Sequence, residues 1–113
     1  MTKKETIEDD VLEELEEEKV DVIKYTFTKP VDFEGEEYKE ITINLEVLTG
    51  RDIKEVSNQL QLQGEAISFA ETDKSFLGAL AARAANLPME FMDYIPAKDF
   101  SKITMEVQNF LLL

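Results

Sequence analysis

The chain has 113 residues, enough for one domain, and 43% of them are hydrophobic, which is sufficient for a packed interior. It carries 12 basic and 25 acidic residues, and this net charge of −13 argues against binding to nucleic-acid phosphates or to anionic membranes. It has no cysteine and no histidine, which excludes disulfides and thiolate catalysis and removes the commonest general base and the commonest nitrogen metal ligand. An enzyme would have to work with carboxylates, lysines or tyrosines alone, and since the sequence shows no assembled site we expect no cofactor and no metal.

The chain begins with an acidic arm, residues 1–19. Residues 1–23 contain ten acidic and three basic residues and therefore hold more than half of the excess negative charge. Four apolar residues of the arm fall on one side of a helical wheel: Ile7, Val11, Leu12 and Leu15. A lone helix of about 12 residues is marginal in water. The arm is therefore predicted to be disordered or marginally helical, and helical only when its apolar side meets a partner or the rest of the chain.

Two segments of alternating apolar and polar residues follow the arm, at 22–29 and 39–47, and they predict an antiparallel β-hairpin. Pro30 is expected to end the first strand because proline cannot donate to the ladder. Gly35 is expected in the turn because glycine adopts positive φ freely. Pairing that continues as far as Phe33 and Tyr38 is an alternative. A hairpin alone is unstable, so the apolar side of the second strand needs a cover. That side consists of Ile41, Ile43, Leu45 and Val47.

Helical periodicity replaces the alternation after residue 49 and predicts three main helices, at 51–62, 73–86 and 98–112. Thr49 and Asp52 have the spacing of a capping box, and Asp99 is expected to cap the last helix. A short helix is predicted after Pro88. The fold class is therefore α+β, a two-stranded antiparallel hairpin followed by a three- to four-helix cluster, with residues 20–113 as a single domain.

Several apolar residues lie outside the main helical patterns and are candidates for binding a partner. These residues are Met89, Phe91, Met92, Met105 and Leu112. They are either ordinary core or part of an exposed groove or helix face that binds an apolar helix. Methionine suits such a surface because its flexible side chain adapts to varied sequences.

The order of motifs in residues 22–112 supports a family resemblance. The motifs are Lys29-Pro30, Phe33 to Tyr38, Ile41 to Leu45, Leu48 to Asp52, Ala85 to Glu90, Ile95 to Phe100 and Val107 to Leu111. In this order and spacing the chain resembles the tail assembly chaperones of tailed bacteriophages. No counterpart of the acidic arm is identified in that family.

The resemblance implies a phage or prophage protein of virion morphogenesis, without catalysis. Such chaperones bind the tape measure protein and keep it soluble while the tail tube assembles. Self-association, or association with a frameshift-extended form of the chain, is a further expectation. The protein is expected in the cytoplasm of the bacterial host and not in the mature virion. The alternative is an acidic nucleic-acid mimic of the anti-restriction type, which the charge of −13 alone supports.

Overall fold

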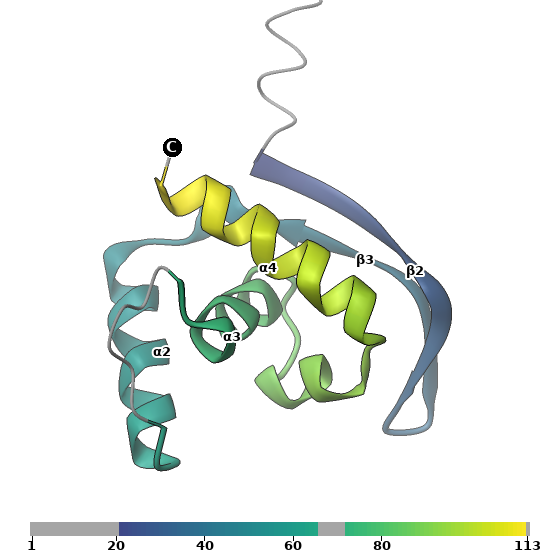
Figure 1. Ribbon diagram of the computed structural model, residues 1–113, viewed down its shortest axis with the longest axis horizontal. Helices are drawn as coiled ribbons and strands as arrows, with labels where there is room; N and C mark the ends of the chain where they lie inside the picture. Colours follow the sequence, from purple (N-terminus) through teal and green to yellow (C-terminus); the bar gives the residue numbers. More distant parts are fainter. Residues whose placement is uncertain (1–20, 66–71, 113) are drawn as a thin grey trace, which may run out of the picture.

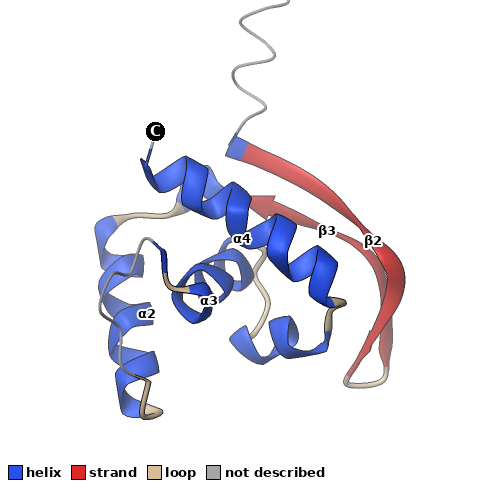
Figure 2. Ribbon diagram, viewed as in Figure 1, coloured by secondary structure: helices blue, strands red, loops and turns tan. Residues whose placement is uncertain are grey.

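The computed structural model describes residues 21–65 and 72–112, so the acidic arm lies outside the described residues, as does most of the linker before the second predicted helix. The elements, in chain order, are β2 (Val22–Phe33), β3 (Glu36–Asn44), the 3-10 helix η2 (Leu45–Val47), α2 (Gly50–Leu62), α3 (Lys74–Ala84), the 3-10 helix η4 (Met89–Tyr94) and α4 (Ala97–Leu112). The predicted α+β class, a two-stranded antiparallel hairpin followed by helices, is confirmed (Figure 2).

The hairpin turns at Glu34 and Gly35, which both have positive φ, 52° and 82°. A two-residue turn of this kind matches the right-handed twist of the paired strands. Pairing runs up to the turn, so Phe33 and Tyr38 extend the hairpin. The prediction that the second strand reaches residue 47 is wrong. The Asn44 side chain accepts a hydrogen bond from the Glu46 N–H at 3.1 Å and starts η2, which leaves Val47 58% exposed.

The prediction that Pro30 ends the first strand is also wrong, because β2 continues to Phe33. Thr26 lies opposite Glu40 and Val31 opposite Tyr38, so residues 27–30 of β2 face a single residue of β3. This wide bulge needs no ladder hydrogen bond from Pro30, which is why proline is tolerated there.

Asp99 joins the bulge to the first turn of α4, and the prediction that it caps this helix is wrong. Its carboxylate is fully buried. The Tyr25 hydroxyl donates to Oδ1 at 2.6 Å, and the Thr28 N–H and hydroxyl each donate to Oδ2 at 3.0 Å. Burial raises the pKa of Asp99, but the hydrogen bonds from Tyr25 and Thr28 outweigh it and hold the pKa below its ordinary value of 3.8.

The Tyr25 phenol is expected to titrate far above an exposed tyrosine. Burial, the hydrogen bond to Asp99 and its negative charge together raise the pKa of Tyr25 to about 12. The neutral phenol is the donor, so its contribution to stability is complete below its ordinary pKa of 10.0 and is lost as the pH rises from there to about 12. An ultraviolet titration should show one tyrosine that ionises only near pH 12, and the Tyr25→Phe substitution should remove this step. The pKa of Tyr38 is raised as well, by burial and by its hydrogen bond to Glu36, so exposed Tyr94 is the reference. A Tyr25 phenol that ionises together with Tyr94 would contradict the contact with Asp99.

The helix α3 lies in the middle of the helical layer, between α2 and α4 (Figure 1). Eight of its 11 residues are buried, and many of these are alanines that permit close approach of its neighbours. A Cβ atom added at Gly78 would lie 2.8 Å from Cε1 of Phe100, so α3 and α4 meet closely at this glycine.

The start and end of α2 follow the predicted signals. The Thr49 N–H donates to Oδ2 of Asp52 at 2.7 Å, and this bond, with the Arg83 guanidinium, lowers the pKa of Asp52. Gly64, with φ of 91°, follows the end of the helix. Arg83 of α3 also contacts Asp52 at 2.6 Å and forms an ion pair with Glu55, which ties α3 to α2.

Candidate partner-binding site

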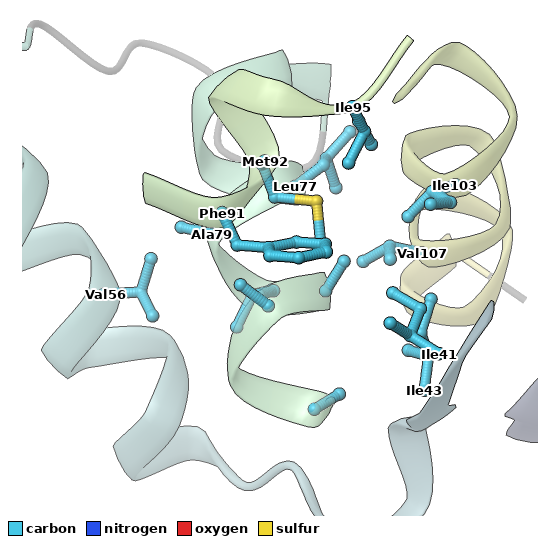
Figure 3. Packing of buried hydrophobic residues seen from close by; sticks show 14 of the residues in the cluster. Ile41, Ile43, Val56, Leu77, Ala79, Phe91, Met92, Ile95, Ile103 and Val107 are labelled. Carbon is cyan, nitrogen blue, oxygen red and sulfur yellow. The ribbon is translucent and has the colours of Figure 1, made fainter. Parts of the chain in front are cut away.

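The five residues predicted to bind a partner do not form one surface. Phe91 is fully buried and Met92 is 5% exposed, so for these two residues the structure matches the first alternative, ordinary core. Figure 3 shows both side chains inside the hydrophobic cluster, with Val56 of α2 on one side and Val107 of α4 on the other. Met89 is half-buried, whereas Met105 and Leu112 are 59% and 57% exposed.

Met89 lies at the junction of two adjoining pockets, which we call the Met89 groove. The pockets measure about 160 and 250 Å³ and share Gln63, Ala79, Met89 and Glu90. Residues of α2, α3, η4 and α4 line the groove. Its apolar lining is Val56, Leu60, Ala79, Leu87, Pro88, Met89, Met92 and Phe100. The Gln63 amide approaches the Met89 sulfur at 3.9 Å from the α2 side. The groove therefore presents a flexible methionine between two helical elements.

The groove has an acidic rim, formed by Glu65, Glu90 and Asp93, all exposed. One cation, Arg83, also lines the groove, but its guanidinium is already paired with Asp52 and Glu55. The hydrogen bond from Arg83 to Asp52 raises the pKa of the guanidinium, so it stays charged. A negative rim around an apolar floor favours a partner that has basic side chains beside an apolar face.

Met105 and Leu112 lie elsewhere, on the outward side of α4. They are seven residues apart and so share one side of the helix. The opposite side of α4 contains Ile103 and Val107, which are buried in the core. The sequence prediction that Met105 and Leu112 face away from the main apolar side of this helix is confirmed.

Sequence reasoning did not identify most of the groove. Helical periodicity does not associate Leu60, Ala79 or the acidic residues of the rim with a site. No local signal marks these residues, because the groove exists only where the end of α2 meets η4 across α3.

Comparison with models of known protein families assigns the chain to one family. A family model described as "Phage tail assembly chaperone proteins, E, or 41 or 14" matches residues 24–112. The chain belongs to the phage tail assembly chaperone family. No curated protein and no solved structure matches it. The match begins at the third residue of β2 and ends with α4, so the hairpin and all the described helices of this tail assembly chaperone are inside it.

The described part of the tail assembly chaperone shows two further features. None of its helices is long and apolar enough to cross a membrane. In residues 21–65 and 72–112, no group of three or more acidic residues is arranged to hold a metal ion. A chaperone family implies a role in assembly and not in catalysis, and it implies partners among tail proteins.

Proposed function

We propose that this tail assembly chaperone binds the tape measure protein and keeps it soluble during assembly of the tail tube. The observation that carries the proposal is the Met89 groove, an apolar floor with an acidic rim in a protein of the chaperone family. The preferred ligand is an amphipathic helix with an apolar face and basic flanks. Self-association and a frameshift-extended form of the chain stay predictions from the resemblance.

The groove suits a helix for a physical reason. A partner helix that inserts one or two apolar side chains between α2 and η4 removes them from water, and this transfer drives binding. Met89 can change rotamer to fit different side chains, because it is unbranched and only half-buried. Of the five predicted residues, Met89 and Met92 line this groove, and Phe91 supports it from the core. Met105 and Leu112 belong to a separate surface.

The proposal predicts that Met89→Glu abolishes the solubilising activity. A carboxylate on the floor of the groove would be buried by the partner and would face the acidic rim. Truncating a central apolar anchor costs about 1 to 4 kcal/mol, so the affinity should fall by about 5- to 1,000-fold. Co-expression with the tape measure protein, followed by measurement of its soluble fraction, tests this.

Met105→Glu is the matched control, because it makes the same chemical change at an exposed methionine outside the groove. It should leave the tape measure protein soluble. Equal solubility with Met89→Glu would refute the groove as the site, and an insoluble tape measure protein even with the wild type would refute the function. Binding that is lost steeply on adding salt would favour the nucleic-acid mimic instead, because apolar burial is only weakly screened.

A further inference from the structure

The outward side of α4 carries a row of exposed residues that the groove does not use. The row, which we call the outer α4 stripe, consists of Lys98, Lys102, Met105, Asn109 and Leu112. Its first half is basic, and its second half has two apolar side chains, Met105 and Leu112, with Asn109 between them. Met105 and Leu112 are among the most exposed large apolar side chains in the described residues. We propose that the acidic arm of the same molecule, residues 1–19, binds this stripe.

The charges favour this arrangement. The arm contains nine acidic and three basic residues, whereas residues 20–113 contain 16 acidic and nine basic ones, so most of the surface repels the arm. Several exposed basic residues form none of the ion pairs among the described residues, and Lys98 and Lys102 are two of these that share one side of α4 with Met105 and Leu112. The charge of Lys102 also acts on the buried carboxylate of Asp99. On α4 itself, the exposed carboxylate of Glu106 lies beside the stripe. The two lysines therefore offer the arm an attractive site on a repulsive surface.

The arm is attached at the appropriate place. Tyr25 and Thr28 contact Asp99 at the first turn of α4, and β2 and α4 run in opposite directions in Figure 1. The six residues from Thr28 back to Val22 span about 20 Å as a strand, and the 13 residues from Asp99 to Leu112 span about 20 Å as a helix. The start of β2 therefore lies toward the end of α4, where the apolar half of the stripe is.

The lengths and the apolar sides also agree. A helix over residues 7–18 is about 18 Å long, and the stripe from Lys102 to Leu112 is about 15 Å long. The apolar side of the arm would cover Met105 and Leu112, while its acidic residues would reach the lysines. Each of the two segments is a weak binder alone, but attachment in one chain supplies an effective concentration in the millimolar range.

An engineered disulfide in the full chain tests the proposal, because the natural chain has no cysteine. Leu15→Cys combined with Leu112→Cys should form a disulfide within one molecule in a glutathione buffer. The matched control combines Leu15→Cys with Val47→Cys. Val47 is 58% exposed and follows Asn44, which pairs with Val22, so it is within reach of the arm but lies off α4. We expect the Leu112 pair to close about 10-fold faster.

Charge reversal supplies the second measurement. The substitutions Lys98→Glu and Lys102→Glu are added to the protein with cysteines at 15 and 112. They should slow formation of its disulfide by about 3- to 10-fold, because two exposed lysines that attract the acidic arm become carboxylates that repel it. Equal closure at Leu112 and Val47 would overturn the proposal, since it would indicate an arm without a preferred site. Disulfides between molecules that increase with protein concentration would also overturn it, because a second copy would then occupy the stripe. Closure insensitive to charge reversal would overturn the role of the lysines.

Discussion

Replacing Phe91 with alanine is expected to lower the free energy of unfolding by about 3 to 5 kcal/mol. Phe91 is fully buried, and its ring centroid lies 5.0 Å from that of Tyr38 and 5.3 Å from that of Phe33. Since those rings belong to the hairpin and Phe91 belongs to η4, the substitution opens a cavity at the junction of the hairpin with the helices. Urea denaturation followed by circular dichroism measures the loss.

The control for this prediction is Met105→Ala, which removes a large exposed side chain and should change the stability by no more than about 0.5 kcal/mol. A Phe91→Ala protein as stable as the wild type would mean that the ring is not in the core. In that case the sequence prediction that Phe91 contacts a partner would regain its basis.

Asp99→Ala is expected to destabilise the protein by about 2 to 4 kcal/mol. The substitution removes the acceptor of the Tyr25 hydroxyl and of both Thr28 donors. Tyr25 is half-buried and Thr28 is exposed, so water replaces part of what is lost. The larger effect is that the first turn of α4 is no longer joined to the bulge of β2. The same denaturation measurement applies.

The Asp99→Asn substitution removes the negative charge but keeps the shape of the side chain. We expect it to lower the free energy of unfolding by less than Asp99→Ala does, because the remaining amide oxygen still accepts a hydrogen bond. The pKa of Asp99 is lowered in the folded protein, so its charge contributes fully above the ordinary value of 3.8 and its contribution is lost as the pH falls through the folded value. The difference in stability between wild type and Asp99→Asn should therefore shrink in acid. A difference that stays constant down to the acid-unfolded state would show that the carboxylate is not the charged acceptor.

The parts of the fold predicted from sequence depend on residues that are close together in the chain. The Thr49 and Asp52 capping box needs only a spacing of three, and the turn needs only two neighbouring residues with positive φ, Glu34 and Gly35. Period-two alternation likewise identified the buried side of β3, including Ile41 and Ile43. These signals are local, and local energetics alone is enough to produce them.

The errors arose where distant segments decide the outcome. Pro30 breaks a regular strand, but the bulge removes the need for its N–H, and the bulge is held by Asp99, 71 residues away from Thr28. Asp99 has a typical capping position, yet Tyr25 and Thr28 bind its carboxylate. A sequence pattern contains no information on which of two satisfactory partners is nearer in space.

The candidate site was predicted in part for the same reason. The helical periodicity of the sequence is enough to show that Met105 and Leu112 face away from the core, because α4 is a long regular helix. The six residues of η4 are too few for a periodic pattern, so the burial of Phe91 and Met92 could not be separated from exposure. The Met89 groove combines four elements and has no signature in any one of them.

The contact of Asp99 with Tyr25 and Thr28 also constrains the order of events during synthesis. The hairpin is a local structure whose strands are joined by two residues, whereas its fastening to α4 spans 71 to 74 residues of chain. A ribosome therefore releases the hairpin, with one apolar side uncovered, well before the last helix exists to receive it. The acidic arm precedes the hairpin in the chain, so it leaves the ribosome before this apolar surface. It gives the nascent chain its negative charge during the interval in which aggregation is most favourable.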